Sequence, residues 1–153
     1  MLLTSPNVYV KDTGTPKGRG VFARAGFAGG EVVEVCPVVL LRTPFEELPA
    51  GVERLVFNWE RLAGVPGTQA LALGYGSLYN HDNPANLRYE ADETGLLLRL
   101  TAVRDIPAGE ELTINYNAEG GAPEWDDDNW FERMGVEPIT GSRPAGRGRR
   151  RAS

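Results

Sequence analysis

The segment GYGSLYNHDNPANLRYE, residues 74–90, gathers polar side chains that could bind a small ligand. The only histidine of the chain, His81, stands there between Asn80 and Asp82, and Asn86 follows after a proline. Amide and imidazole groups both donate and accept hydrogen bonds, so a rigid turn that carries them could hold a purine or a charged, amino-acid-like ligand. We therefore predict that this turn binds a cofactor.

Metal binding and general-base catalysis are poor explanations of the same turn. One histidine with Asp82 alone cannot fill a tetrahedral zinc site, so no metal is expected. The single cysteine, Cys36, lies in the apolar run EVVEVCPVVLL and is expected to be a buried, inert thiol rather than a nucleophile. The alternative to cofactor binding is a structural histidine in a surface turn.

A second candidate lies in KGRGVFA, residues 17–23, where Gly18 and Gly20 flank Arg19. Glycine has no Cβ, so a ligand can approach the backbone N–H and C=O groups there. The flanking residues are typical of a strand and no helix follows, which excludes a dinucleotide fingerprint and a phosphate-binding loop. The alternative is an ordinary turn, in which a Gly-x-Gly pair is common.

The third candidate is AGEELTINYN, residues 108–117, a turn followed by an alternating strand. Because side chains alternate along a strand, Leu112, Ile114 and Tyr116 fall on one face, and the phenol points where the core-side residues point. The alternative reading is a buried tyrosine whose hydroxyl is satisfied by hydrogen bonding.

Taken in order, these three segments resemble the motifs of the SET-domain family of protein-lysine methyltransferases. GRGVFA is similar to the family's N-terminal glycine motif, ALGYGSLYNH with Asn86 to its asparagine–histidine motif, and IPAGEELTINY to its terminal motif. The likeness spans residues 8–117. It is greatest to short, single-domain viral and bacterial members, which share the ALG-aromatic-G sequence and an aromatic C-terminal segment in place of a cysteine cluster.

The resemblance implies a mostly β SET-domain fold of several short sheets, with a knot-like C-terminal threading and one or two short helices. It also implies an S-adenosyl-L-methionine-dependent protein-lysine N-methyltransferase, which transfers a methyl group directly to a deprotonated lysine amine. Tyr116 is then the catalytic residue, which orients the amine and the methyl group through its hydroxyl and the negative face of its ring.

The resemblance also assigns the residues around the cofactor and the substrate. The cofactor-binding residues that it implies are Gly18, Arg19, Gly20, Asn80 and His81, with Trp130 and Phe131 stacking on adenine and Trp125 as the alternative to Trp130. His81 would contribute backbone contacts and brace the turn. Tyr75 and Tyr79 are expected to line the substrate channel.

Three departures from the family pattern keep a second interpretation open. Asp82 and Asn83 stand where a serine–cysteine pair is usual, Pro84 comes one place early, and Asn115 replaces a frequent aspartate. Asn86 keeps its spacing from Asn80. The alternative is a catalytically weak SET-fold module that binds a cofactor or a protein.

The elements that must position these segments are mostly strands. Short runs rich in β-branched and aromatic residues predict strands within residues 7–12, 20–26, 31–41, 86–92, 95–106 and 111–117. A hairpin loop is expected near Asp92 to Gly95, with glycine where a positive φ is needed. One amphipathic helix is predicted over residues 52–62, with its apolar stripe in the core, and Gly64 ends it.

The length and charge of the chain favour one domain with a separate tail. Of its 16 basic and 21 acidic residues, five arginines lie in RPAGRGRRRAS, residues 143–153, which leaves 11 against 21 and a net charge of −10 for residues 1–142. We expect a SET-like domain over residues 5–140 and a disordered, arginine-rich tail over residues 141–153. The acidic body favours a basic, lysine-containing protein as substrate and repels phosphate backbones.

The remaining expectations concern location and partners. No apolar run approaches the roughly 20 residues that cross a bilayer, and the N-terminus lacks the features of a secretion signal, so no membrane partner and a cytoplasmic location are expected. Nucleic acid is expected as a partner only through the arginine-rich tail. Lys11 and Lys17 are the only lysines of the chain, so self-methylation has few targets and the methylated lysine is expected in another protein. Pairing into a homodimer remains open.

Overall fold

The computed structural model describes residues 2–117 and 121–124 of the chain. The predicted domain end near residue 140 and the arginine-rich tail lie outside these described residues, as do Trp130 and Phe131.

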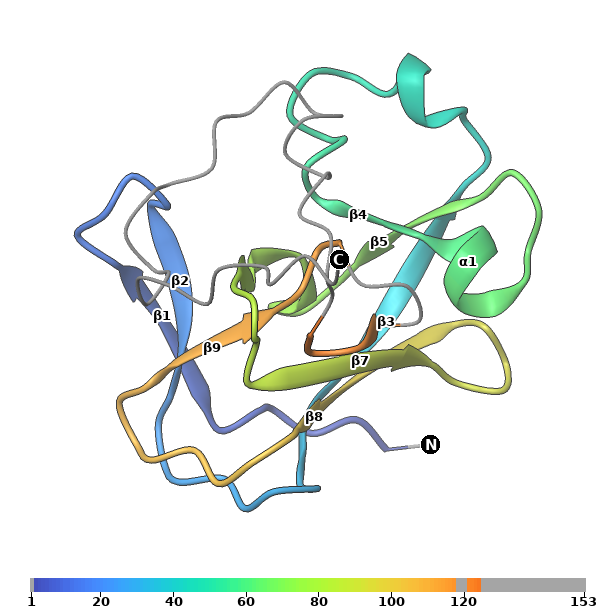
Figure 1. Ribbon diagram of the computed structural model, residues 1–153. Helices are drawn as coiled ribbons and strands as arrows, with labels where there is room; N and C mark the ends of the chain where they lie inside the picture. Colours follow the sequence, from blue (N-terminus) through green and yellow to red (C-terminus); the bar gives the residue numbers. More distant parts are fainter. Residues whose placement is uncertain (1, 118–120, 125–153) are drawn as a thin grey trace, which may run out of the picture.

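Strands in two sheets dominate the described part of the chain, as predicted (Figure 1). The four-stranded sheet has the order β1 (Val8–Asp12), β2 (Arg19–Ala23), β9 (Glu111–Ile114) and β6 (Asn80–His81). The five-stranded sheet has the order β4 (Val56–Asn58), β5 (Gln69–Ala72), β3 (Val32–Leu41), β8 (Leu97–Ala102) and β7 (Leu87–Ala91). The mostly β prediction is therefore confirmed.

The described helices are short: α1 (Trp59–Ala63) and the two 3₁₀ turns η1 (Phe45–Glu47) and η2 (Gly76–Leu78). None of them has the length and apolar composition that a membrane-spanning helix requires. The turn η2 lies between the end of β5 and β6, and it therefore brings the chain from one sheet to the other.

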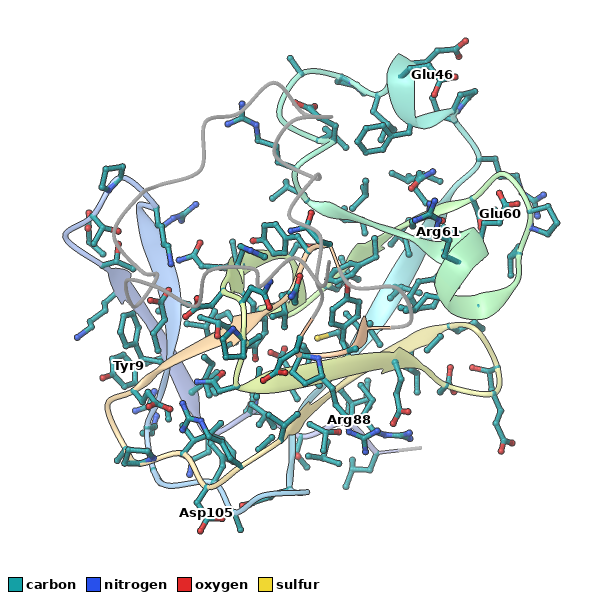
Figure 2. All side chains as sticks on the ribbon, in the orientation of Figure 1. Tyr9, Glu46, Glu60, Arg61, Arg88 and Asp105 are labelled. Atoms are coloured by element: carbon teal, nitrogen blue, oxygen red, sulfur yellow. The ribbon has the colours of Figure 1, made fainter. Side chains whose placement is uncertain are left out.

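The core forms where the two sheets turn their apolar side chains inward. The largest fully buried apolar side chains are Trp59, Tyr79, Leu87, Leu98, Leu100, Ile106, Leu112, Ile114 and Val21. Full burial of a side chain of the Leu or Ile type contributes about 1.5–3 kcal/mol. Labelled charged residues such as Glu60 and Asp105 lie instead at the edge of the view, and both of them and Arg88 are exposed (Figure 2). Cys36 is fully buried, as expected.

The predicted hairpin is confirmed. β7 and β8 pair antiparallel with Ala91 opposite Leu98, and Gly95 in the loop has a φ of 67°. The carboxylate of Asp92 accepts hydrogen bonds from the backbone N–H groups of Leu96 and Leu97 and closes the loop. Glycine adopts this left-handed conformation without steric strain because it has no Cβ.

The helix predicted over residues 52–62 is wrong in its first half. Residues 56–58 form β4 instead, which pairs antiparallel with β5. The helix begins only at Trp59, because the side chain of Asn58 accepts the N–H of Arg61 and caps the N-terminus there. Its predicted end is confirmed: Gly64 is the left-handed C-cap residue. Sheet pairing has overridden a helical spacing of apolar residues.

Candidate active site

The three segments singled out in the sequence meet where β9 lies between β2 and β6 (Figure 1). β2 pairs antiparallel with β9, with Val21 opposite Leu112. β6 pairs parallel with β9, with Asn80 opposite Thr113. One strand thus brings the glycine segment, the asparagine–histidine turn and the segment that ends in Tyr116 to one junction.

Asn80 connects two strands of this junction through its side-chain amide. Its Nδ2 donates to the carbonyl of Arg19 at 3.0 Å and to Oε1 of Glu111 at 2.7 Å. A Cβ on Gly20 would lie 2.5 Å from Oε1 of Glu111 and 3.0 Å from Nδ2 of Asn80. Gly20 is therefore required by packing, because the two polar side chains cross directly over its backbone.

Two basic residues and a left-handed glycine stand beside Asn80 and His81. Gly18 has a φ of 74°, and a Cβ there would meet nothing within 4 Å. Its carbonyl accepts the N–H of Thr13, so part of its backbone is engaged within the turn. Nζ of Lys17 donates to the carbonyl of His81 at 3.2 Å, and Arg19 is exposed.

Tyr116 contacts β6 at His81 and the residue before β6, Tyr79. Its backbone N–H donates to Nδ1 of His81 at 3.0 Å, and its hydroxyl donates to the carbonyl of Tyr79 at 2.5 Å. The two rings lie 5.3 Å apart between centroids. The imidazole of His81 accepts the bond from the Tyr116 N–H through Nδ1, so that nitrogen carries no proton. His81 is a brace for Tyr116 in this geometry.

The hydroxyl of Tyr116 is a neutral donor under physiological conditions. Burial raises its pKa well above the ordinary tyrosine value, and the nearby Tyr89 and Glu111 raise it further. Burial also raises the pKa of Tyr89 to about 12. Tyr89 donates to the carbonyl of Asn115 at 3.1 Å. Both phenols therefore stay protonated near neutral pH and donate hydrogen bonds.

The two predicted channel tyrosines differ in their exposure. Tyr75 is 36% exposed, whereas Tyr79 is 1% exposed and its ring is part of the core. The hydroxyl of Tyr79 donates to Oε1 of Glu34 at 2.7 Å. Its ring therefore points into the protein, and its carbonyl is the group that meets Tyr116.

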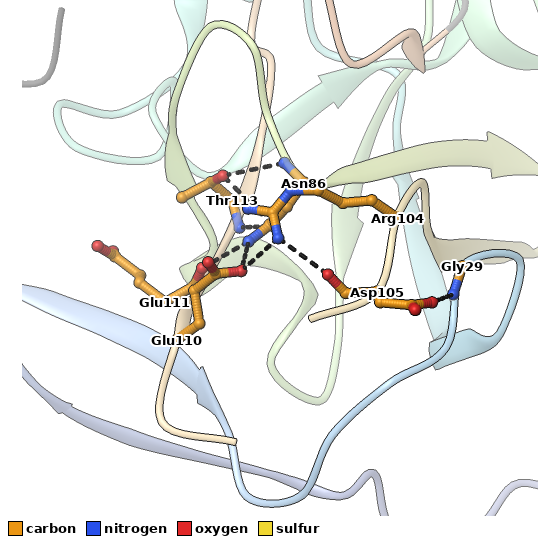
Figure 3. A network of polar contacts seen from close by, with 7 residues as sticks. All are labelled: Gly29, Asn86, Arg104, Asp105, Glu110, Glu111 and Thr113. Carbon is orange, nitrogen blue, oxygen red and sulfur yellow. Dashed lines mark hydrogen bonds and ion pairs between the residues drawn. The ribbon is translucent and has the colours of Figure 1, made fainter. Parts of the chain in front are cut away.

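Asn86 fastens the turn after β6 to β9 (Figure 3). Its Nδ2 donates to the carbonyl of Glu111 at 2.8 Å and to Oε2 of Glu110 at 3.2 Å, and its Oδ1 accepts the N–H of Thr113 at 2.8 Å. Arg104 pairs with the same carboxylate of Glu110 at 2.9 Å. Asn86 is buried, so its polar side-chain atoms need hydrogen-bond partners within the protein. These side-chain bonds to β9 add to the backbone pairing of the two-residue strand β6.

Asn115, which departs from the family pattern, forms hydrogen bonds through both the nitrogen and the oxygen of its side-chain amide. It is fully buried, and its Nδ2 donates to the carbonyl of Pro123 at 3.4 Å. Its Oδ1 accepts the N–H of Asn117 at 2.9 Å. A carboxylate could not donate the first of these bonds. The same carbonyl of Pro123 accepts the N–H of Ala85, which connects the returning chain to the turn after β6.

Metal and thiol chemistry have little support in the described residues. No three His, Cys, Asp or Glu side chains between residues 2–117 and 121–124 are grouped as metal ligands would be. Burial, followed by the nearby Glu34, raises the pKa of the Cys36 thiol far above its usual value. That thiol therefore stays protonated and is a poor nucleophile.

Three residues that bind the site segments were not singled out in the sequence: Lys17, Glu34 and Glu111. Glu34 gave a signal, because an acidic residue inside the apolar run VVEVC is unusual in a buried strand. Lys17 and Glu111 gave none, since their contacts depend on how distant strands pair. Trp130 and Phe131, predicted to stack on adenine, lie outside the described residues.

Comparison with known proteins gives a family match and two curated relatives. The sequence model of the SET domain matches residues 18–117. A Schizosaccharomyces pombe protein, the histone-lysine N-methyltransferase specific for H3 lysine-37, is 32% identical over 131 residues, which cover 86% of this chain and 80% of that protein. The histone-lysine N-methyltransferase set9 of the same yeast is 31% identical over 93 residues, 60% of this chain and 20% of that protein.

Solved structures share the fold. A Plasmodium falciparum protein described as a histone methyltransferase superposes with a TM-score of 0.59 at 25% identity, over 76% of this chain and 97% of that chain. A chain of the Chaetomium thermophilum Polycomb Repressive Complex 2 superposes with a TM-score of 0.58 at 22% identity, over 75% of this chain and 16% of that chain. The latter likeness concerns the fold alone.

Proposed function

The chain belongs to the SET-domain family of protein-lysine methyltransferases, and we propose that it transfers a methyl group from S-adenosylmethionine to a lysine of a basic protein. One observation carries the proposal. The hydroxyl of Tyr116, two residues beyond β9, donates to the carbonyl of Tyr79, immediately before Asn80 and His81, and β9 itself pairs with the glycine segment on β2. A neutral phenol thus stands beside the groups expected to bind the cofactor.

The chemistry of the junction fits the proposed cofactor. S-adenosylmethionine has a carboxylate, an amine and an adenine ring, and when bound it supplies an electrophilic methyl group on a sulfonium. Lys17 and Arg19 carry positive charge for a carboxylate, and the amide of Asn80 and the carbonyl of His81 suit the polar edge of a purine. Gly18 leaves open space beside them. Trp130 and Phe131 remain predicted stacking partners of adenine.

In the proposed mechanism Tyr116 orients the reacting groups and removes no proton. Its raised pKa keeps the hydroxyl protonated, and the hydrogen bonds of its backbone and hydroxyl fix the ring. Correct placement of two reactants is itself a large part of catalysis. No covalent intermediate with the protein would be required, because the amine nitrogen would bond to the methyl carbon as the carbon–sulfur bond breaks and a neutral thioether leaves.

The lysine amine must lose its proton before it can attack. With a reference pKa of about 10.4, deprotonation at pH 7 costs about 4.6 kcal/mol, from about 3.4 pKa units at about 1.36 kcal/mol each. A site beside Tyr116 that excludes water would disfavour the ammonium form and lower this cost. The proposal therefore assigns desolvation, and not a general base, to the activation of the amine.

The proposed substrate is a lysine-rich, basic protein of the histone type. The name of the relative at 32% identity specifies a lysine of histone H3 as its target. Residues 1–142 of this chain carry 11 basic and 21 acidic residues, and that negative balance attracts basic segments around a target lysine.

A radiolabelled methyl-transfer assay on mixed lysine-rich proteins tests the proposal. Transfer of label from S-adenosylmethionine to lysine is expected with the wild-type chain and not without it. Tight cofactor binding with no transfer to any protein would favour the alternative, a SET-fold module that binds but does not catalyse. The departures at Asn83 and Pro84 are the observation behind that alternative, whereas Asn115 has a structural use for its amide.

A further inference from the structure

A carboxylate lies buried beneath the candidate active site and belongs to none of the three motifs. Glu34 is on β3 of the five-stranded sheet and is only 5% exposed. Removing a charged group from water is costly unless hydrogen bonds satisfy it. The groups that bind this carboxylate therefore indicate what the residue does.

Both oxygens of Glu34 bind the segment that leads into β6. Oε2 accepts the backbone N–H of Tyr75 at 2.9 Å, and Oε1 accepts the hydroxyl of Tyr79 at 2.7 Å. These two donors stand immediately before and after the 3₁₀ turn η2. A Cβ on Gly74, which has a φ of 64°, would lie 2.5 Å from Oε2. The turn is wrapped closely around the carboxylate, which fixes both of its ends.

Tyr79 connects this carboxylate to Tyr116. The Tyr79 side chain is held by Glu34, and its backbone carbonyl accepts the hydroxyl of Tyr116. Any rotation of Tyr79 about its backbone would carry that carbonyl away from the phenol. Both Tyr79 and Glu34 are buried, so solvent does not compete for either bond.

We propose that Glu34 is a positioning residue for methyl transfer, which acts through Tyr79 to set the orientation of the Tyr116 hydroxyl. The inference rests on the proposed function. The competing explanation is that Glu34 only stabilises the packing of β3 against the turn. That explanation predicts a loss of folding stability with unchanged turnover per folded molecule, whereas a positioning role predicts a loss of turnover in the folded enzyme.

The main variant is Tyr79→Phe, which removes the hydroxyl that Glu34 holds and keeps the backbone carbonyl. We expect kcat to fall about tenfold, while KM for the protein substrate and the dissociation constant of S-adenosylmethionine stay within about twofold, as loss of orientation requires. Glu34→Gln should retain more of kcat than Tyr79→Phe, because the amide oxygen can still accept the Tyr75 N–H while its Nε2 donates to Tyr79.

Thr68→Val is the matched control. Thr68 is 1% exposed and donates its hydroxyl to the carbonyl of Val65 at 2.7 Å, in the loop between α1 and β5. The variant also deletes one buried hydroxyl hydrogen bond, but away from the β6 junction. It should lower stability comparably and leave kcat unchanged.

A second measurement reports on the Tyr116 hydroxyl without turnover. The chain has five tyrosines, so ¹³Cζ-tyrosine signals can each be assigned by Tyr→Phe substitution. The Tyr116 signal should shift in Tyr79→Phe and in Glu34→Gln, and it should keep its position in Thr68→Val. Should Tyr79→Phe not fold, Glu34→Ala removes both bonds of the carboxylate, and a Tyr116 signal at its wild-type position in that variant overturns the inference.

The possible failures are distinguishable. If the wild-type chain transfers no methyl group, the proposed function fails and the inference fails with it. If the wild type is active and folded Tyr79→Phe keeps both kcat and the Tyr116 signal, the proposed function stands and the positioning role of Glu34 is wrong. A fall of kcat in Thr68→Val equal to that in Tyr79→Phe would also overturn it.

Discussion

The strands of the five-stranded sheet and those of the four-stranded sheet are held in place by different interactions. In the five-stranded sheet, the ten-residue strand β3 pairs along its length with β5 and β8, and fully buried leucines such as Leu98 and Leu100 face the core. In the four-stranded sheet, β6 has two residues and is held to its neighbours largely by the side chains of Asn80, His81 and Asn86.

The five-stranded sheet therefore mainly determines the folding stability, and the four-stranded sheet mainly determines the geometry of the candidate site. Apolar burial over long ladders supplies free energy of folding without fixing any one atom closely, whereas bonds between buried polar side chains and backbone fix particular atoms. Glu34 spans the two regions, because it lies on β3 and binds the turn that leads into β6. Substitutions in the two sheets should therefore affect different measurements.

The largest loss of turnover is expected for Tyr116→Phe, beside the four-stranded sheet with its polar side-chain bonds. Removing the hydroxyl deletes the bond to the Tyr79 carbonyl and the group that orients the amine. Loss of a preorganised donor typically costs about 100-fold to 1000-fold in turnover, and we expect at least about 100-fold here. Affinity for S-adenosylmethionine, measured by calorimetry, should change less than about twofold. Equal losses of turnover and cofactor affinity would contradict the assigned role.

The second-largest effect is expected for Gly20→Ala, because the added Cβ would collide with the side chains of Asn80 and Glu111. The added Cβ would lie 2.5 Å from Oε1 of Glu111, so the side chains that join β2, β6 and β9 must move. We expect the dissociation constant of S-adenosylmethionine to rise about tenfold, measured by titration.

Gly26→Ala is the matched control for Gly20→Ala. The nearest atom to its Cβ would be the carbonyl oxygen of Ile106 at 3.5 Å, an ordinary contact distance. This variant should bind the cofactor as the wild type does. Identical affinities of the two alanine variants would show that the junction is not the cofactor site.

The rate should rise between pH 7 and pH 9, up to about tenfold per unit, as the substrate amine loses its proton. Burial raises the pKa of Tyr89 to about 12 and raises that of Tyr116 also. A tyrosine with a raised folded-state pKa contributes stability that is fully present below about pH 10 and is lost as the pH rises towards about 12. The phenols of Tyr89 and Tyr116 therefore stay protonated between pH 7 and pH 9.

A flat pH–rate profile, under conditions where chemistry limits turnover, would contradict a substrate that must deprotonate. Pre-steady-state measurement of methyl transfer at each pH establishes which step is limiting.

The smallest effect on turnover is expected for Leu100→Ala, in the five-stranded sheet. Leu100 is fully buried, and such truncations lower the free energy of unfolding by about 2–5 kcal/mol. Turnover per folded molecule should stay within about twofold of the wild type, with stability measured by urea unfolding. A loss of turnover as large as that of Gly20→Ala would mean that the two regions are not separable.

Much of the fold could be predicted from local patterns. The β-branched runs gave β1, β2, β3, β7, β8 and β9, and Gly95 marked the hairpin. β5 was missed because its sequence, QALA, is short and small, and β6 because a two-residue strand exists only through pairing with β9. The start of the predicted helix was wrong because Val56 and Phe57 pair with β5.

The candidate site was predictable as far as motif order allowed. The order of the motifs indicated that the segments around Gly20, Asn80 and Tyr116 belong together, and the strand pairing brings them to one junction. The bonds of Lys17, Glu34 and Glu111 could not be predicted, since each joins residues far apart in the chain. The roles assigned to the cofactor and channel residues remain predictions.

Calorimetric titration of the wild-type chain with S-adenosylmethionine tests the central claim most directly. We expect saturable binding of one cofactor per chain, weakened in Gly20→Ala and retained in Tyr116→Phe. An absence of binding at millimolar cofactor, or binding that Gly20→Ala leaves unchanged, would contradict it.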